Sequence, residues 1–276
     1  MICGYGIDIK PVMIKITFIG AGNVAWHLSQ AFFKRGFKIE QVWSRTMASA
    51  GALSQLVDAQ PIDKFTHLAR HDGVFIISLN DEAVPQVIRN LKLPGNLVLH
   101  TSGTIEMNIL DSISSDNGVL YPLQTFTKGI PLKIQKVPVL IEASSSQQLE
   151  LIRSLASSIS EIVYPANSEV RSKIHVAAVF ANNYTNYMYA VASELLAGSG
   201  FNLDLLRPLI EETSRKAMEA EPVNLQTGPA RRGDIEVIRK HLGLLASKPE
   251  YAEIYRLLAR QIINKYNPGS TKDAEL

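Results

Sequence analysis

Residues 14–25 read Ile-Lys-Ile-Thr-Phe-Ile-Gly-Ala-Gly-Asn-Val-Ala, an apolar strand that runs into a Gly-x-Gly-x-x-Ala motif. Gly20 would permit a tight turn, Gly22 would let the backbone approach a pyrophosphate, and Ala25 would let the next helix pack closely on the strand. Apolar residues recur at helical spacing after the motif, which favours a dinucleotide-binding β–α unit over an ordinary glycine-rich turn. The residues expected to hold the pyrophosphate at the helix N-terminus are Gly20, Gly22, Asn23 and Val24.

The end of the second predicted strand, residues 39–43, favours NADP over NAD as the cofactor. About twenty positions beyond the glycine motif, an NAD site normally has Asp or Glu, which accepts from the ribose 2′-hydroxyl. Here that position is Arg45, flanked by Ser44 and Thr46. A guanidinium and two hydroxyls suit a 2′-phosphate, because Arg can bind a phosphate through two parallel donors. The alternative is a solvated Arg in a surface loop.

The composition excludes several classes of function. The chain has 276 residues, 46% of them hydrophobic and 20% charged, with a formal net charge of +2. This balance predicts no nucleic-acid partner, and no apolar run is long enough to span a membrane. Cys3 is the single cysteine, which excludes an internal disulfide and indicates a reducing, cytoplasmic compartment. The histidines lack metal-ligand spacing, so no metal is expected.

Strands and helices alternate in the first part of the chain, which predicts a doubly wound parallel Rossmann sheet. Residues that follow two of the strands, 78–81 and 100–103, would lie at the carboxyl edge of the sheet, where open sheets bind ligands. Ser78, Asn80 and Ser102 are therefore expected to contact the nicotinamide ribose and amide. Further strands are expected at 73–78, 96–100, 119–122 and 137–142, with helices at 48–57, 83–91 and 147–157.

From Glu169 onward the strand pattern ends, and the sequence predicts an all-α domain. One long helix is expected over residues 172–199, and the apolar faces at 176–196 and 254–263 would be covered in a homodimer. Other helices are expected at 204–220, 234–245 and 249–266. We predict an N-terminal extension over residues 1–12, an NADP-binding Rossmann domain over 13–165, and a helical substrate and dimerisation domain over 166–276.

Polar residues on the long predicted helix suggest a site for proton transfer. His175 and Asn182 are seven residues apart and would share one helix face, with Asn183 beside it. An imidazole that titrates near neutrality can protonate the oxygen or nitrogen left negative after hydride addition, and amides can orient a carbonyl or carboxylate. The alternative is a core or interface histidine with two asparagines that only hydrogen bond in helix packing.

A loop between predicted helices, Thr227-Gly-Pro-Ala-Arg-Arg-Gly-Asp234, supplies two adjacent arginines. Arg231 and Arg232, with Thr227, would clamp a substrate carboxylate or phosphate, including one in a partner subunit's cleft. Asp234 fits equally well as the N-cap of the next helix, with the arginines solvated.

A third group of polar residues, Tyr121, Gln124 and Thr125, follows a predicted strand. These residues either border the cleft or form an ordinary strand-to-loop turn, and the pattern favours the turn. The chain has no Gly-x-Ser-x-Gly elbow and no Gly-Lys-Ser phosphate loop, which argues against a hydrolase or a kinase.

The order of these motifs resembles the family of Rossmann-like NADP oxidoreductases that carry a C-terminal helical domain of unknown function. More distantly, the layout is similar to pyrroline-5-carboxylate reductase and to the 6-phosphogluconate dehydrogenase superfamily. The resemblance implies a two-domain NADP-linked reductase or dehydrogenase, dimeric through a C-terminal domain like that of 6-phosphogluconate dehydrogenase. The chain departs from the hydroxyacid dehydrogenase branch, which has a catalytic Lys four residues before an Asn, because Ala177 stands four residues after Lys173.

We therefore predict an NADP(H)-dependent oxidoreductase that transfers hydride between NADPH and a C=O or C=N group of a small, anionic substrate. The alternative is a non-catalytic NADP-binding sensor or assembly protein, which the missing Lys-Asn pair favours. The predicted catalytic residues are His175, Asn182 and Asn183, and the predicted substrate-binding residues are Thr227, Arg231 and Arg232.

Overall fold

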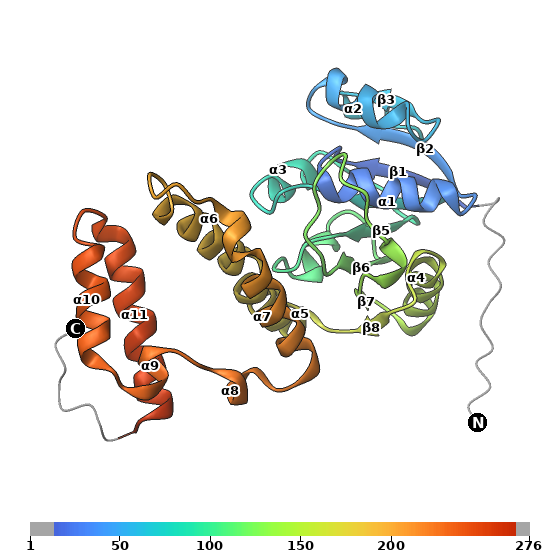
Figure 1. Cartoon of the computed structure of the whole chain (residues 1–276). Helices are drawn as coiled ribbons and strands as arrows, with labels where there is room; N and C mark the ends of the chain where they lie inside the picture. Colours follow the sequence, from blue (N-terminus) through green and yellow to red (C-terminus); the bar gives the residue numbers. More distant parts are fainter. Residues whose placement is uncertain (1–13, 269–276) are drawn as a thin grey trace. The chain divides into compact units, whose positions relative to one another are not determined.

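The computed structural model describes residues 14–268, so the predicted extension over residues 1–12, with Cys3, lies outside the described residues. The chain divides into two compact units, the first ending at Asn183 and the second beginning at Tyr184 (Figure 1). The predicted domain boundary after residue 165 was placed where the strand pattern ends, and it stays a prediction.

An eight-stranded sheet forms the centre of the first unit. Its strand order is β3-β2-β1-β4-β5-β6-β7-β8, and the order reverses direction between β1 and β4. That reversal is the topological switch point, where open sheets bind ligands, and the arrangement confirms the predicted Rossmann class. The strands are β1 (Lys15–Ile19), β2 (Lys38–Trp43), β3 (Gln60–Ile62), β4 (Gly73–Ile77), β5 (Leu97–His100), β6 (Asn117–Pro122), β7 (Val139–Ala143) and β8 (Val163–Pro165).

Two edge strands and the direction of one strand pair differ from the sequence prediction. The edge strands β3 and β8 were missed because each has three residues, one of them a proline, and so shows no periodicity. The pair β6–β7 is antiparallel, whereas all other neighbours are parallel. The chain returns from β6 to β7 through a loop rather than through a crossover helix, which permits the antiparallel pairing.

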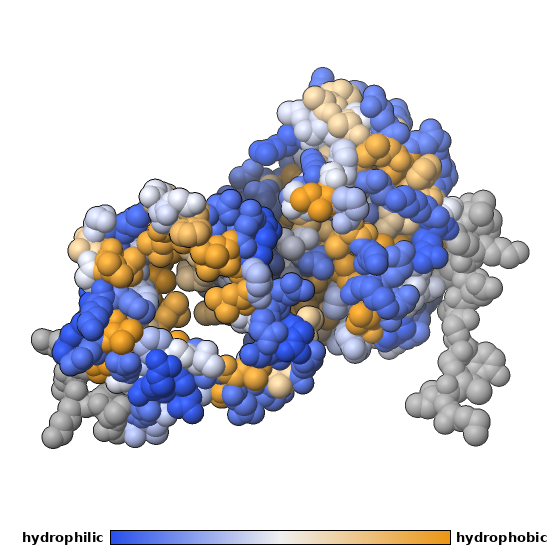
Figure 2. Space-filling view, viewed as in Figure 1, coloured by the Kyte–Doolittle hydropathy of each residue, from blue (hydrophilic) through white to orange (hydrophobic). Residues whose placement is uncertain are grey.

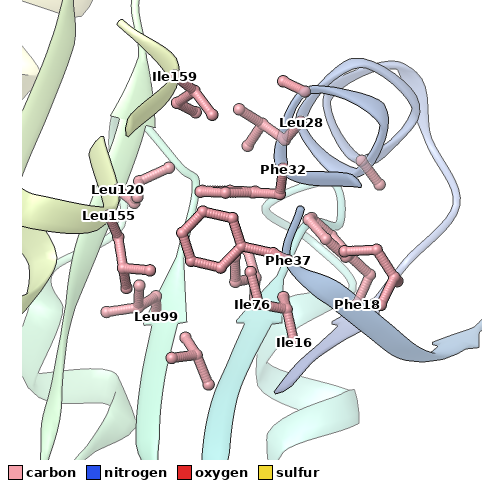
Figure 3. Packing of buried hydrophobic residues seen from close by; sticks show 14 of the residues in the cluster. Ile16, Phe18, Leu28, Phe32, Phe37, Ile76, Leu99, Leu120, Leu155 and Ile159 are labelled. Atoms are coloured by element: carbon pink, nitrogen blue, oxygen red, sulfur yellow. The ribbon is translucent and has the colours of Figure 1, made fainter. Parts of the chain in front are cut away.

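Helices cover both faces of the sheet in the first unit. On one face Leu28 and Phe32 of α1 meet Leu155 and Ile159 of α4, above fully buried strand residues such as Phe18 (Figure 3). The helix α3 packs on the opposite face, in a separate buried cluster. Each such fully buried side chain contributes about 1.5–3 kcal/mol relative to an exposed one. The helices are α1 (Asn23–Lys34), α2 (Met47–Ser54), α3 (Val84–Ile88), α4 (Ser146–Ile159) and α5 (Ser168–Ala178).

The long predicted helix is interrupted by a change of winding. Helical residues begin at Ser168, where the Asn167 side chain caps α5 by accepting from the Val170 amide at 2.9 Å. A π-helical segment, Val179–Tyr184, then leads to α6 (Thr185–Leu195). Because a π turn is wider than an α turn, the simple α-helical phase assumed between His175 and Asn182 is wrong.

The described residues of the second unit form helices and loops, as predicted. A small buried cluster of Ile238, Ala259 and Ile263 joins α10 to α11. Within residues 14–268 no helix combines the length and the apolar character needed to cross a membrane. The further elements are a short 3-10 helix (Leu203–Leu206), α7 (Arg207–Glu219), α8 (Pro222–Leu225), α9 (Pro229–Arg232), α10 (Ile235–Leu244) and α11 (Pro249–Tyr266).

Candidate functional site

A cavity of about 630 Å³ opens at the carboxyl ends of the central strands of the first unit. It is lined by the glycine motif, by the turn between β2 and α2, and by the residues that follow β4, β5 and β6. Of the ten predicted cofactor residues, the lining includes Gly22, Asn23, Val24, Ser44, Arg45, Ser78, Asn80 and Ser102, but not Gly20 or Thr46.

Glycine stands at positions 20 and 22 of the motif for different physical reasons. Gly20 has φ +123°, and a Cβ there would stand 2.1 Å from the carbonyl oxygen of Ser78, so the protein itself requires glycine at this turn. A Cβ on Gly22 would meet nothing nearer than that same oxygen, at 4.0 Å. No contact within the described chain accounts for glycine at this position, whereas the close approach of a pyrophosphate to the backbone does.

The start of α1 fits a bound anion. Gly22 is the N-cap, and its carbonyl accepts from the Trp26 amide at 2.9 Å, so the preceding amides of the first turn have no helical partner. The first turn carries no acidic side chain that would compete with a phosphate. The residues present therefore suit the pyrophosphate of a dinucleotide.

At the turn after β2, Ser44 and Arg45 line the cavity and Thr46 caps the next helix. The Thr46 hydroxyl accepts from the Ser49 amide at 3.3 Å and donates to the Ser49 hydroxyl at 3.0 Å. The nearest carboxylate on β2, that of Glu40, pairs instead with Lys15 at 3.3 Å. The turn thus presents a guanidinium and the N-terminus of α2, a combination that suits a phosphate.

Hydroxyl groups connect the ends of β4 and β5. The Ser78 and Thr101 hydroxyls lie 3.1 Å apart, and both residues line the cavity. The Ser102 hydroxyl oxygen accepts from the Thr104 and Ile105 amides at 3.1 and 3.0 Å. Ser102 therefore orders the loop after β5 while its own hydroxyl proton stays available to a ligand.

The structure joins Tyr121, at the end of β6, to His175 of α5. The Tyr121 hydroxyl and His175 Nδ1 are 2.8 Å apart, and both residues line the cavity. A Cβ on Gly103 would stand 2.5 Å from His175 Nδ1 and 2.9 Å from Tyr121 Cζ, so a side chain at residue 103 would clash with both members of the pair. Burial raises the pKa of Tyr121, which keeps its proton at neutral pH.

A smaller cavity of about 370 Å³ shares Tyr121, Gln124 and His175 with the first. Asn182 and Asn183 also line it, so the three residues predicted as catalytic lie around one cavity. Sequence analysis considered a place at the border of the cleft for Tyr121 and Gln124 but favoured an ordinary turn. The strand order could have identified these two residues, because β6 lies parallel beside β5 and both strands end at the same edge of the sheet.

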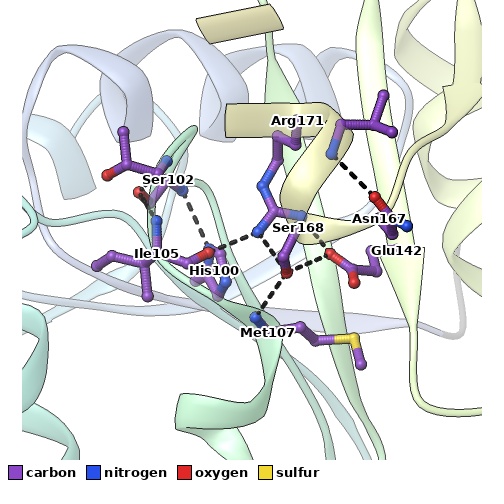
Figure 4. A network of polar contacts seen from close by, with 10 residues as sticks. His100, Ser102, Ile105, Met107, Glu142, Asn167, Ser168 and Arg171 are labelled. Carbon is purple, nitrogen blue, oxygen red and sulfur yellow. Dashed lines mark hydrogen bonds and ion pairs between the residues drawn. The ribbon is translucent and has the colours of Figure 1, made fainter. Parts of the chain in front are cut away.

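A buried ion pair fixes α5 against the sheet (Figure 4). The Arg171 side chain is fully buried and pairs with Glu142 of β7. It also donates to the Ile105 carbonyl at 2.5 Å and to the Ser168 hydroxyl at 3.1 Å. Because His175 follows Arg171 by about one helical turn, this network holds the imidazole against Tyr121. Sequence analysis missed it, since its members are far apart in the chain.

His100 belongs to the packing beneath the site rather than to its wall. Sequence analysis placed it with residues 100–103 beside the nicotinamide, but its side chain is fully buried and is not part of the cavity lining. Its Nδ1 accepts from the Ser102 amide at 3.2 Å. Burial, together with the nearby Arg171 guanidinium, lowers the pKa of His100 to about 3, so the ring is neutral.

The predicted substrate residues Thr227, Arg231 and Arg232 belong to the second unit, and their role towards a substrate stays a prediction. The Arg231 guanidinium lies 4.6 Å from the centre of the Tyr266 ring. Asp234 caps α10 by accepting from the Val237 amide at 3.4 Å, which confirms the alternative interpretation of that residue. Among residues 14–268, no group of three or more His, Cys, Asp or Glu side chains is arranged to hold a metal.

These features define a Rossmann-type nucleotide-binding protein with a helical C-terminal part. Residues 3–125 match a Rossmann-like domain, and residues 137–262 match a domain of unknown function (DUF2520). A putative NADP oxidoreductase from Bacteroides fragilis is 40% identical, with a TM-score of 0.84 over 91% of this chain and 98% of that chain. The chain belongs to the family of Rossmann-like NADP oxidoreductases with this C-terminal domain, which confirms the resemblance stated from the motifs.

Two other structures share the fold at lower identity. An imine reductase from Myxococcus stipitatus, in complex with NADP+, is 18% identical, with a TM-score of 0.62 over 91% of this chain and 92% of that chain. A pyrroline-5-carboxylate reductase from Coxiella burnetii is 17% identical, with a TM-score of 0.53 over 91% and 96%. A search of curated proteins found no match.

Proposed function

We propose that this chain is an NADPH-dependent reductase that adds hydride to a C=O or C=N group of a small, anionic substrate. The observation that carries the proposal is the hydrogen bond between Tyr121 and His175 at the wall of the cavity that the glycine motif opens. A proton donor is needed there, because the substrate oxygen or nitrogen gains negative charge when the adjacent carbon accepts hydride.

The cofactor of this proposal is NADP(H), as in the names of the Bacteroides fragilis and Myxococcus stipitatus proteins. When bound, NADPH supplies the hydride. Gly22 and the first amides of α1 would hold the pyrophosphate, and Ser44 and Arg45 would hold the 2′-phosphate, with Thr46 ordering the start of α2. The residues assigned to the nicotinamide end are Ser78, Asn80 and Ser102.

Tyr121 and His175 would act together as the proton source. The raised pKa of Tyr121 keeps the phenol protonated, so it can donate to the substrate atom that has become negative. His175 lies at 2.8 Å and can replace the proton that Tyr121 releases. The product is an alcohol from a carbonyl substrate or an amine from an imine substrate, with one hydride and one proton gained.

The smaller cavity is the proposed place for the body of the substrate. It adjoins the larger one at Tyr121 and His175, and the amides of Gln124, Asn182 and Asn183 line it. These amides would orient a carbonyl or carboxylate of the substrate. The anionic character of the substrate is inferred separately, from the adjacent Arg231 and Arg232, which with Thr227 form a pattern suited to a carboxylate or phosphate.

The cofactor assignment is tested by calorimetric titration of the whole chain with NADPH and NADH. We expect the protein to bind NADPH more tightly than NADH. Arg45→Asp should raise the Kd of NADPH at least about tenfold and change the Kd of NADH little, because a hydrogen bond to the charged 2′-phosphate is lost. Arg35→Asp, at the exposed end of α1, is the matched control for the change of charge. Binding of neither nucleotide by the unaltered protein would overturn the proposal.

The alternative is a non-catalytic NADP-binding sensor or assembly protein. The specific observation that favours it is Ala177, which stands four residues after Lys173 where the hydroxyacid dehydrogenase branch has its asparagine. A panel of ketoacids, ketones and cyclic imines separates the two functions. Oxidation of NADPH with any member supports the reductase, whereas binding of NADPH with no oxidation across the panel supports the sensor.

A homodimer and a cytoplasmic location complete the proposal. The second unit carries large apolar side chains on its surface, such as Leu209, 64% exposed, and Leu244, 81% exposed. Figure 2 shows several such residues (orange) on the visible face of the helical part. A second copy of the chain would cover them. The cytoplasmic location rests on the single cysteine, which suits a reducing compartment.

A further inference from the structure

We propose that Lys128 is a cation of the pyrophosphate site, brought there by the loop over residues 123–133, which we call the strap. This inference rests on the proposed binding of NADP(H). The strap follows β6 and carries Lys128 into the lining of the larger cavity, which also contains Gly22 and Asn23 of the glycine motif. Lys128 comes from a part of the chain about a hundred residues away from that motif.

The strap is attached to the same helix that would bind the phosphates. His27 of α1 donates from Nε2 to the Thr127 carbonyl at 2.9 Å, and its ring centre lies 5.2 Å from that of Phe126. The next residue, Lys128, places its Nζ 5.5 Å from the centre of the Trp26 ring. Two successive residues of the first turns of α1 thus hold three successive residues of the strap.

This attachment determines where the charge of Lys128 lies. The Trp26 amide donates its backbone hydrogen bond to the carbonyl of the N-cap Gly22, so the ammonium group stays close to the beginning of α1. Anions favour that end of a helix, and a lysine there adds a full charge to the partial charges of the amides. An indole face can hold an ammonium group by a cation–π contact until a phosphate is present.

The two cations of the cavity would therefore recognise different parts of the cofactor. Arg45 lies at the turn after β2, where the 2′-phosphate is expected, and that phosphate distinguishes NADPH from NADH. Lys128 lies at the start of α1, where the pyrophosphate is expected, and both nucleotides have a pyrophosphate. Loss of Lys128 should weaken both nucleotides equally, whereas loss of Arg45 should weaken NADPH alone.

The test compares Lys128→Met with Lys133→Met by calorimetric titration of the whole chain. Lys133 is exposed on the same strap and is not part of the cavity lining, so its variant controls for the loss of one charge. The probes are NADPH, NADH and 2′-AMP, which has the 2′-phosphate but no pyrophosphate. We expect Lys128→Met to raise the Kd of NADPH and of NADH by a similar factor of about ten, in the range for one charged hydrogen bond, and to leave 2′-AMP within about twofold.

Each outcome separates this inference from the proposed function. Lys128→Arg should retain binding, because it keeps the charge. Unchanged affinity of Lys128→Met for NADPH, while the unaltered protein binds NADPH, overturns the role of Lys128 alone. An equal loss for 2′-AMP, or an equal loss in Lys133→Met, also overturns it, because the effect is then one of general charge. Absence of nucleotide binding by the unaltered protein overturns the proposed function itself.

Discussion

The two units of this chain bury their apolar residues to different extents. The first unit has large buried clusters on both faces of the sheet, and Phe18, Phe32 and Leu99 are fully buried in the larger one. The second unit has only small buried clusters, such as the one around Ile238, and leaves Leu209 and Leu244 exposed. A sheet with helices on both faces buries its apolar residues within one unit. A few helices packed together leave apolar faces exposed, which another surface can cover. The first unit contains the candidate site, and the proposed dimer would cover the exposed apolar faces of the second unit.

The largest expected effect concerns the chemistry of the first unit. Replacing His175 by Ala or Tyr121 by Phe should lower turnover by about 10²–10⁴-fold, the usual contribution of a positioned acid or base. The affinity for NADPH should stay within about twofold, because neither residue is assigned to the phosphates. His241→Ala, which removes a histidine of the second unit that bonds Tyr255 at 2.7 Å, is the control. Undiminished turnover in both site variants would remove the pair from the mechanism.

The next effect concerns the stability of the first unit. Arg171→Met should lower its free energy of unfolding by about 3–5 kcal/mol, because Glu142 would keep a largely buried charge without its partner. Chemical denaturation measures the loss. The double variant Arg171→Met with Glu142→Gln should recover part of it, since the unpaired charge is removed. Arg153→Met, which breaks the exposed pair with Glu150, should change stability by less than about 1 kcal/mol.

His100 should make the first unit sensitive to acid. Its pKa is about 3 in the folded protein and near 6.5 in the unfolded chain, so the unfolded chain binds the extra proton between these values. Stability is therefore complete above pH 6.5 and falls as the pH falls towards 3, by about 3 kcal/mol between pH 7 and pH 4. His100→Asn should lose this part of the pH dependence in parallel denaturation curves. If the free energy of unfolding of the variant fell equally steeply with pH, other groups would cause the acid sensitivity.

The smallest expected effect concerns the second unit. It tests whether a second copy of the chain covers the exposed apolar residues of this unit. Leu257 and Leu258 of α11 are 51% and 47% exposed. Replacing both by Glu should shift the protein from dimer to monomer in analytical ultracentrifugation, because charges would have to be buried in the interface. Arg260→Glu on the same helix should leave the dimer in place. If the unaltered protein is a monomer, the exposed faces need another explanation.

Much of the fold followed from local patterns in the sequence. The strands β1, β4, β5, β6 and β7 were predicted because each contains a short, nearly continuous apolar run, which is typical of strands buried on both faces. The edge strands escaped because three residues carry no period. The π-helical segment was also missed, because it differs from an α-helix only in hydrogen bonds that span one residue more, and this leaves no compositional signal.

The candidate site was predictable in part for a similar reason. The glycine motif and Arg45 are local signals, whose spacing reflects one turn and one strand. Tyr121, Lys128 and Arg171 act through partners that lie far away in the chain, namely His175, Trp26 and Glu142. No spacing along the sequence relates such pairs, because only the order of the strands brings them together.

The sequence by itself therefore determined the class of protein: a Rossmann sheet with a glycine motif for a dinucleotide, an arginine suited to NADP, and a helical C-terminal part. These properties depend on contacts within a single strand, turn or helix, and such contacts join residues that are near one another in the sequence. The tertiary structure alone decided that Tyr121 hydrogen bonds to His175 beside Gly103 and that a buried arginine holds α5 in place. Those contacts join distant segments, so they exist only once the sheet has brought the segments to one edge.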